Sequence, residues 1–203
     1  MDAHKHRLLV LGSGPSAAMI DQIDRKGYYV IALNNGWRAM KNPYEIKLWH
    51  HSNDIHHYHP LPERDLMDHL YVTGWGYITH FFQTRATCIY DREKFPTGTT
   101  AFLDLMSRLS SSRPNMIGEI AFLGCEHDYS GEQTHFYGKG TPDPMRYGSY
   151  FLIENFRRIR QWADREGIVL RDFSGNTTGL LYKAIFDESS AGNPPVEGAS
   201  KAV

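Results

Sequence analysis

Polar residues able to bind charged groups or transfer protons stand directly after the apolar runs of this chain. These clusters are Gly12 to Ser16, Asn34 with Asn35, His51 to Asn53, Glu126 to Tyr129, and Ser174 with Asn176, while Thr97 to Thr100 precede a helical pattern. Ligands of parallel α/β proteins bind outside the carboxyl ends of the strands. The pattern therefore predicts one binding site assembled from these clusters.

The first cluster, Gly12-Ser13-Gly14-Pro15-Ser16, is hereafter called the glycine turn. Glycines allow a ligand to approach the backbone closely, and Pro15 suits the first turn of a helix. Backbone N–H groups at a helix N-terminus attract phosphate. We therefore expect a phosphate-bearing ligand, with a purely structural tight turn as the alternative. The turn lacks the third glycine and the later acidic residue of the dinucleotide fingerprint, which disfavours NAD, and it lacks the lysine of a P-loop.

Strand and helix patterns alternate along the chain. Apolar runs predict strands within residues 7–14, 28–34, 45–52, 70–76, 86–92, 119–124 and 168–173. Apolar spacing predicts helices within 16–27 and 149–167, and residues 93–112 are expected to be a Thr-rich loop that opens a third helix. This alternation predicts an α/β fold with a single Rossmann-like parallel sheet flanked by helices. We expect one nucleotide-binding catalytic domain over residues 1–183 and a disordered tail over 184–203, where small, polar, Pro and Gly residues dominate.

Composition narrows the function classes. The 203 residues carry a formal net charge of −1, so there is no global basic field for non-specific binding of nucleic acid or anionic membranes. Two cysteines, Cys88 and Cys125, make neither a disulfide framework nor a zinc pattern, and buried free thiols are expected. The first apolar run is too short for a signal segment or a membrane span. We expect a cytoplasmic protein.

Four segments taken together resemble a known family. "LVLGSGPSA", "VIALNN", "FPTGTTAFLDLM" and "IAFLGCEHDYSG" are similar, in order and spacing, to the bacterial sialyltransferases of glycosyltransferase family 42 and their relatives of unassigned function. The resemblance spans residues 8–176. It implies a sialyltransferase-like variant of the GT-A fold with a lid loop, and a metal-independent, inverting transfer of a sugar from a CMP- or UDP-type nucleotide to a hydroxyl acceptor. No cofactor beyond the nucleotide sugar is implied.

The resemblance also implies roles for individual residues. Gly12, Ser13, Gly14, Pro15 and Ser16 would face the phosphates, Asn34 would contact the nucleotide or sugar, and Thr97 with Gly98 would match a Ser-Gly pair. Tyr129 would bind the phosphate and assist its departure, and Tyr137 or Tyr147 would supply a second hydroxyl. These are the expected nucleotide-binding residues.

The catalytic base is where the chain departs from the family. The family's histidine before the late helix has no counterpart in "RYGSYFLIENF". His127, His135 and Asp128 are the alternative bases, because each follows a predicted strand and histidine titrates near neutrality. Tyr129 completes the expected catalytic set.

Other readings stay open. A Mg²⁺-dependent pyrophosphokinase or other phosphoryl-transfer enzyme would need carboxylates at the strand ends, and a non-catalytic nucleotide-binding module would need no base. Five histidines lie within "HHSNDIHHYHP", from His50 to His59. They could form a metal-binding site, a substrate-binding loop or a solvated loop, and we assign no metal site to them. "THFYGKGTPDPMRYG", residues 134–148, has the length of a lid. A nucleic acid is expected only as a modified acceptor, and the sequence leaves the acceptor and the oligomeric state open.

Overall fold

One parallel sheet organises the molecule. The computed structural model describes residues 5–52, 60–75, 99, 102–103, 106–107, 116–139 and 149–187. The described strands are β1 (His6–Leu11), β2 (Tyr28–Leu33), β3 (Ile46–Ser52), β4 (Tyr71–Trp75), β5 (Ile117–Leu123) and β6 (Val169–Asp172). They form a six-stranded sheet in the order β4-β3-β2-β1-β5-β6, with every neighbouring pair parallel. The predicted α/β class and parallel sheet are confirmed, while the strand predicted within residues 86–92 lies outside the described residues.

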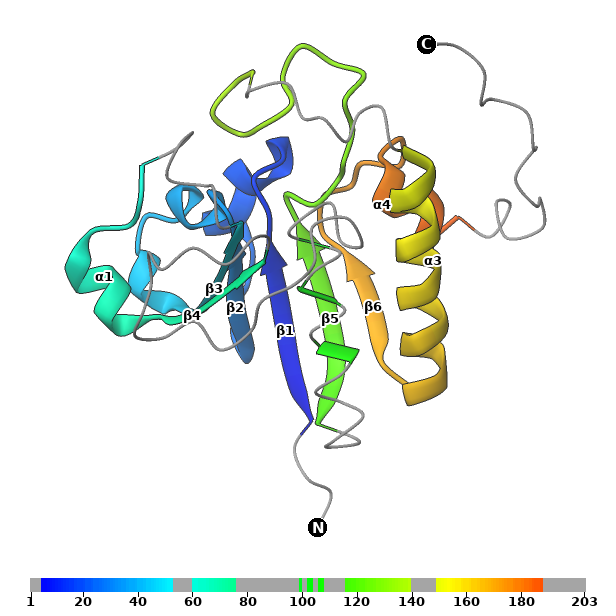
Figure 1. Cartoon of the computed structure of the whole chain (residues 1–203), viewed down its shortest axis with the longest axis horizontal. Helices are drawn as coiled ribbons and strands as arrows, with labels where there is room; N and C mark the ends of the chain where they lie inside the picture. Colours follow the sequence, from blue (N-terminus) through cyan, green and yellow to red (C-terminus); the bar gives the residue numbers. More distant parts are fainter. Residues whose placement is uncertain are drawn as a thin grey trace.

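The strand order sets where a ligand can be received. The chain runs outward from β1 through β2 and β3 to β4, then returns to the other side of β1 for β5 and β6. The direction of winding thus reverses between β1 and β5, and such a reversal leaves a crevice at the carboxyl ends of the strands. Figure 1 shows the strands pointing the same way, with the loops after β1, β5 and β6 gathered at that end of the sheet. We call this end the carboxyl edge.

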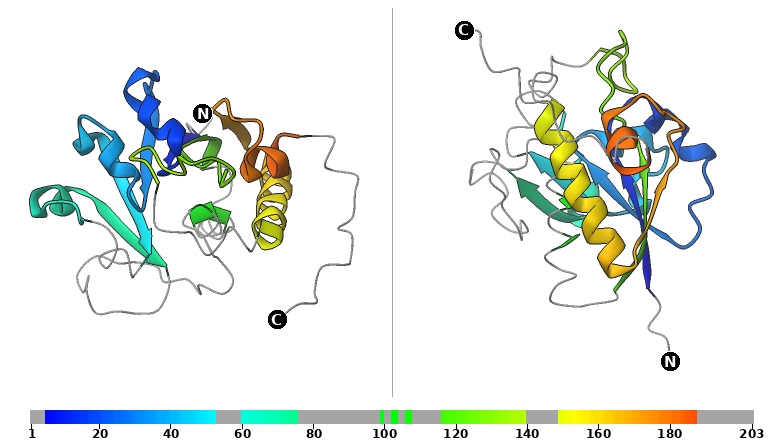
Figure 2. Two further views of the ribbon diagram at one scale, coloured as in Figure 1. Left: turned by 90° about the horizontal axis from the view of Figure 1, so that it is seen from above. Right: turned by 90° about the vertical axis from the view of Figure 1, so that its right-hand side faces the viewer.

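Helices cover both faces of the sheet. The described helices are the 3-10 helices η1 (Pro15–Gln22), η2 (Gly36–Ala39) and η3 (Pro43–Glu45) and the α-helices α1 (Arg64–His69), α3 (Ser149–Glu166) and α4 (Leu180–Ile185), with further helical residues at 99, 102–103 and 106–107. Figure 2 shows α3 running across one face, with η1, η2 and α1 on the other side of the sheet. None of the helices in the described ranges is long and apolar enough to cross a membrane.

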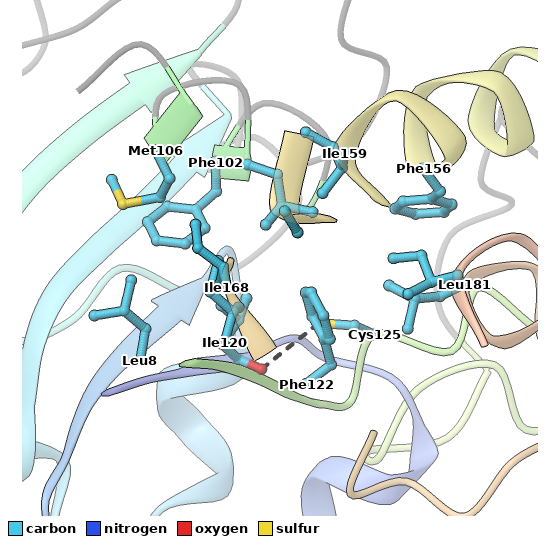
Figure 3. Packing of buried hydrophobic residues seen from close by; sticks show 14 of the residues in the cluster. Leu8, Phe102, Met106, Ile120, Phe122, Cys125, Phe156, Ile159, Ile168 and Leu181 are labelled. Atoms are coloured by element: carbon cyan, nitrogen blue, oxygen red, sulfur yellow. Dashed lines mark hydrogen bonds between the residues drawn. The ribbon is translucent and has the colours of Figure 1, made fainter. Parts of the chain in front are cut away.

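Two apolar clusters follow from the alternation of side chains along each strand. On the α3 side, Ile120 and Phe122 of β5 pack with Phe156 and Leu181 (Figure 3). On the η1 side, Leu9 of β1 belongs to a second cluster with the side chains of η1 and α1. Continuous burial from Leu8 to Leu11 matches a strand covered on both faces, as its apolar run predicts.

Helix α3 is the helix that the sequence marks most clearly. Leu152, Phe156, Ile159 and Ala163 recur at helical spacing, and all four are buried. The chain leaves the helix at Gly167, whose φ of 66° is a left-handed conformation that glycine adopts without strain. The stripe is therefore part of the hydrophobic core, and it fixes α3 against the sheet.

Helix η1 differs from the short helix expected over residues 16–27. It begins at Pro15 but is a 3-10 helix of 8 residues that ends at Gln22. Ala17 and Ile20 are fully buried, and Ile23 packs partly buried against the same cluster. A spacing of three residues aligns side chains on a 3-10 helix, which has three residues per turn. The apolar spacing of this segment thus suits the tighter helix.

The C-terminal boundary of the folded part is set by α4. This helix runs through Ile185, whose side chain is buried, and so extends two residues past residue 183, the expected end of the domain. Burial of Ile185 against α3 and the sheet accounts for the extension of the helix past residue 183.

Candidate functional site

The glycine turn is bonded to the loop that follows β5. The amide of Gly12 donates to the carbonyl of Leu123 over 2.8 Å, and the amide of Gly14 donates to the carbonyl of Gly124 over 2.7 Å. A Cβ atom at position 12 would lie 2.1 Å from the Gly124 oxygen. The close approach that requires glycine here is therefore an approach to the protein's own backbone.

The start of η1 is capped by a carboxylate of the chain. Pro15 has no N–H, so the first amide of the helix is that of Ser16, and it donates to Oε1 of Glu126 over 2.8 Å. The hydroxyl of Ser16 accepts a hydrogen bond from the amide of Gly124 over 2.8 Å. Both groups of Ser16 expected at a phosphate are thus engaged inside the protein.

Glu126 is held deep at this junction. Glu126 is only 3% exposed, and its Oε2 atom has no hydrogen-bond partner among the described residues. A Cβ atom at position 14 would lie 1.9 Å from this Oε2. Since the backbone of Gly14 has an ordinary extended conformation, glycine is required there for space rather than for φ. A buried acceptor without a donor is costly, which marks Oε2 as an unusual group.

Asn34 and Asn35 follow β2, and the side chain of Asn35 contacts Tyr137. Asn34 adopts a left-handed φ of 45°, its amide donates to the carbonyl of His50, and its carbonyl accepts from Trp49 Nε1. Asn35 is 2% exposed, its Nδ2 donates to the hydroxyl of Tyr137 over 3.4 Å, and its Oδ1 has no partner within the described ranges. Backbone turning at Asn34 thus directs the neighbouring side chain to Tyr137.

Tyr137 is surrounded by groups that can bind an anion. The guanidinium carbon of Arg38 lies 5.2 Å from its ring centroid, and the ring of His135 stacks on it at 5.0 Å. Burial raises the pKa of the Tyr137 phenol, so the hydroxyl stays protonated and can donate. We call Asn35, Arg38, His135 and Tyr137 the Tyr137 group. The amide of Phe136 donates to the carbonyl of Ser13 over 3.0 Å and thereby joins this group to the glycine turn.

His127 lies after β5 in a strained conformation. Its φ is 52°, which is uncommon for a residue with a side chain. Its Nδ1 is 3.0 Å from the Tyr129 hydroxyl and its Nε2 is 3.1 Å from Oγ1 of Thr99, while its ring packs 5.3 Å from Phe156. The structure thus brings together two residues of the expected catalytic set, His127 and Tyr129, and adds Thr99.

Asp128 points to a different set of partners. Its carboxylate accepts hydrogen bonds from Ser130, Asn176 and the Thr178 hydroxyl. The Ser130 side chain above all, then that of Thr178, holds the pKa of Asp128 well below its usual range, against the opposing effect of burial. A carboxylate this hard to protonate is a poor general base. Its geometry suits a tie between the β5 and β6 loops.

The histidines of β3 face opposite sides of the sheet. His51 stacks on Trp49 at 4.3 Å, whereas His50 meets Phe102 in the other cluster at 6.0 Å. Burial lowers the pKa of His50 to about 3, so this ring is neutral at physiological pH. Adjacent strand residues cannot ligate one ion from opposite faces. Within the described part of the chain, no group of three or more His, Cys, Asp or Glu is placed to hold a metal ion.

Several predicted residues lie outside the described residues. They are Thr97, Gly98, Tyr147, residues 140–148 of the expected lid, and His56, His57 and His59.

No protein-family model matches the chain, and neither a curated protein nor a solved structure is significantly similar to it. The resemblance to the sialyltransferases therefore stays a prediction.

Sequence reasoning placed Glu126 and Asn35 among the strand-end residues without a role, and it did not single out Arg38. Arg38 follows Asn35 by three residues, which is one turn of the 3-10 helix η2, and no pattern in the sequence predicted that turn. No local signal pairs Glu126 with Ser16, because the two residues are 110 positions apart.

Proposed function

We propose that the protein is a nucleotide-sugar-dependent glycosyltransferase that moves a sugar from a CMP- or UDP-type donor to a hydroxyl acceptor, with inversion and without a metal. The observation that carries the proposal is the strained backbone of His127, with its ring held between Tyr129 and Thr99. Left-handed conformations of residues other than glycine cost about 1 kcal/mol or more and are often found at functional sites. A histidine oriented by a hydroxyl at the carboxyl edge has the properties of a general base.

In this proposal His127 receives the proton of the acceptor. The acceptor oxygen attacks the anomeric carbon, the bond from that carbon to the phosphate oxygen breaks with its electron pair, and the acceptor proton passes to Nε2 of His127. Tyr129 orients the ring through Nδ1. The acceptor hydroxyl takes the place of Thr99 at Nε2, or the Thr99 hydroxyl relays the proton. His135 stays the second candidate base, although its Nδ1 is 2.9 Å from the Thr134 hydroxyl and its ring stacks on Tyr137.

The departing phosphate is assigned to the Tyr137 group. Arg38 supplies a positive charge, and the protonated hydroxyl of Tyr137 supplies a donor. Charge stabilisation by such groups replaces the function that a divalent cation has in other transferases. The amides of Gly12, Gly14 and Ser16 already donate hydrogen bonds to other groups of the protein. In this proposal the glycine turn therefore supports the Tyr137 group and does not bind the phosphate itself.

The proposal also includes a Rossmann-like nucleotide site and a lid loop. A Rossmann-like nucleotide site is supported by the reversal of winding between β1 and β5. A lid over residues 134–148 is supported by the hairpin at its start, in which His135 and Gly138 pair and place Tyr137 beside Asn35.

A non-catalytic nucleotide-binding module is the second candidate. It is favoured by the fact that both ring nitrogens of His127 already have protein partners. The pyrophosphokinase alternative is weakened by Asp128, because both of its carboxylate oxygens accept hydrogen bonds from the chain rather than facing a Mg²⁺ site.

The test combines binding with turnover. Thermal stability is measured with CMP, CDP, UDP, GDP, ADP and ATP, with and without Mg²⁺, and CMP or UDP alone is expected to raise the melting temperature. A ligand at a hundred times its Kd adds about 2.7 kcal/mol to the free energy of unfolding. ³¹P NMR then follows release of the nucleotide from a panel of CMP- and UDP-sugars. We expect His127→Gln to abolish turnover with binding retained.

Matched variants make the test specific. Arg38→Gln should weaken nucleotide binding roughly tenfold, as loss of one charged contact does. Arg158→Gln, a change of the same type on the exposed surface of α3, should have no effect. Nucleotide binding by the wild-type protein without turnover of any donor in the panel would favour the binding module. A preference for ATP with Mg²⁺ would overturn the glycosyltransferase.

A further inference from the structure

At the glycine turn, a side chain of the protein itself occupies the helix N-terminus at which an anion could bind. Phosphate groups bind at helix N-termini because unpaired amides point at them. Here the first amide of η1 belongs to Ser16, and its partner is Oε1 of Glu126 at 2.8 Å. The carboxylate of Glu126 therefore takes the position that the glycine turn would offer a phosphate.

The second oxygen of the Glu126 carboxylate is left without a donor. Oε2 of Glu126 is buried, lies against Gly14 and has no donor among the residues that the structure describes. The phosphodiester that joins a nucleotide to its sugar has no O–H group, so it brings only further acceptors and negative charge, and neither can satisfy this oxygen. Like charges in a partly buried site repel strongly, because the local dielectric is low. Glu126 thus works against a phosphate in two ways, by occupying the amide and by repulsion.

The Tyr137 group offers a phosphate another place to bind. The hydrogen bond from the Phe136 amide to the Ser13 carbonyl places the Tyr137 group directly beside the turn. Arg38 in that group is exposed, and Tyr137 carries a protonated hydroxyl. These are the groups near the turn that offer a positive charge and a donor.

We propose that Glu126 is a specificity-determining residue that keeps phosphate away from the glycine turn, so that the phosphate of the ligand binds at the Tyr137 group. The location of the ligand phosphate rests on the proposed function, whereas the exclusion at Ser16 does not. The consequence is that the glycine turn serves as a scaffold beside the Tyr137 group and binds no phosphate of the ligand.

The experiment uses the full chain and, as the probe, dimethyl phosphate, a phosphodiester that carries a negative charge and no O–H donor. Dimethyl phosphate is titrated into ¹⁵N-labelled protein, and the amide of Ser16 and the side-chain Nε–H of Arg38 are followed by NMR. In the wild type we expect Arg38 to shift and Ser16 to stay unchanged. In Glu126→Gln, we expect the Ser16 amide to shift and the affinity for dimethyl phosphate to rise at least tenfold. Glutamine removes the negative charge and puts an N–H₂ donor in place of Oε2, and its neutral oxygen is a weaker acceptor, which phosphate can displace from the Ser16 amide.

Glu132→Gln is the matched control. Glu132 is exposed in the same loop, so the same loss of charge there should leave the affinity for dimethyl phosphate unchanged within about twofold. An equal gain in both variants would overturn the proposal, because it would show a general charge effect. A Ser16 shift in the wild type would overturn it as well, and this arm needs no variant to fold.

Failure of the proposed function gives a different pattern. If no nucleotide sugar is bound or turned over, yet Glu126→Gln gains binding of dimethyl phosphate at Ser16, the exclusion by Glu126 is supported and the transferase is not. If nucleotide sugars are turned over and Glu126→Gln gains nothing, the transferase is supported and the role of Glu126 is overturned.

Discussion

At the scale of single residues, two neighbours after β5 have opposite chemistry. His127 has a strained backbone and a ring bonded to two hydroxyls, while Asp128 is surrounded by donors from the β5 and β6 loops. One is suited to exchange a proton and the other to stay ionised. Their side chains diverge because the backbone turns at His127 with its positive φ. Adjacent positions in the sequence therefore carry a candidate for catalysis and a structural tie.

Asp128→Asn tests the structural tie. We expect the free energy of unfolding at pH 7 to fall by about 1–2 kcal/mol, because charge-assisted hydrogen bonds to a partly exposed carboxylate are lost. Since the folded-state pKa of Asp128 lies below its unfolded value, this stability is present above about pH 4 and is lost as the pH falls toward the folded pKa. Urea unfolding at pH 7 and pH 3 should show a smaller difference at the lower pH.

Asp164→Asn is the control for that measurement. Asp164 pairs with Arg160 on the exposed surface of α3, and such a pair contributes about 0.5 kcal/mol or less. An Asp128→Asn variant no less stable than Asp164→Asn would show that the loops are not held by this carboxylate.

At the scale of elements, the junction between β1 and β5 is closed by backbone contacts. The two strands pair in parallel, and the hydrogen bonding continues past their ends through the glycine turn. Gly12 is needed there because the Gly124 carbonyl approaches it. The apolar stripe of η1 then holds the helix on the sheet. This arrangement makes the glycine turn a rigid base for the loops around it.

Gly12→Ala tests that closure. The added Cβ would lie 2.1 Å from the Gly124 oxygen and 2.9 Å from Cys125 Sγ. Backbone has to move, so we expect a loss of about 3 kcal/mol in the free energy of unfolding. Among the described residues, the added Cβ of Gly131→Ala meets no atom nearer than 3.9 Å, so this change should alter the free energy of unfolding by less than about 0.5 kcal/mol. Equal denaturation midpoints for the two variants would contradict the packing described here.

At the scale of the whole molecule, the two apolar clusters lie on opposite faces of one sheet. A covered parallel sheet requires both clusters to form together, because each strand contributes side chains to both. Cys125 lies at the end of β5 in the α3-side cluster, and its thiol donates to the Val10 carbonyl (Figure 3). Its accessibility therefore reports the opening of the molecule.

Thiol labelling provides that measurement. Burial raises the pKa of Cys125 to about 12, and the thiolate is the reactive form. In a Cys88→Ser background at pH 8, we expect labelling by a disulfide reagent to be far slower than for a free thiol. The rate should rise with urea in parallel with global unfolding. A labelling rate of Cys125 that is fast without urea and does not change with the urea concentration would show that this cluster opens locally.

Much of the architecture is readable from local sequence. The apolar runs place all six described strands, β1 to β6, and the stripe from Leu152 to Ala163 places α3. These patterns are local because strand and helix periodicities depend on a few consecutive residues. They also place the polar clusters at strand ends, and hence at one edge of the sheet.

The sequence by itself determined the parallel α/β fold, the positions of the polar clusters and the burial of Cys125, because periodicity and apolarity are local properties. Only the tertiary structure decided what those clusters contact. Glu126 meets the Ser16 amide from 110 residues away, and Asn35 meets Tyr137 from 102 residues away. Such contacts depend on strand order and register, since pairing β5 with β1 brings the two strand ends together. The partner of the glycine turn is therefore a property of the fold rather than of the motif.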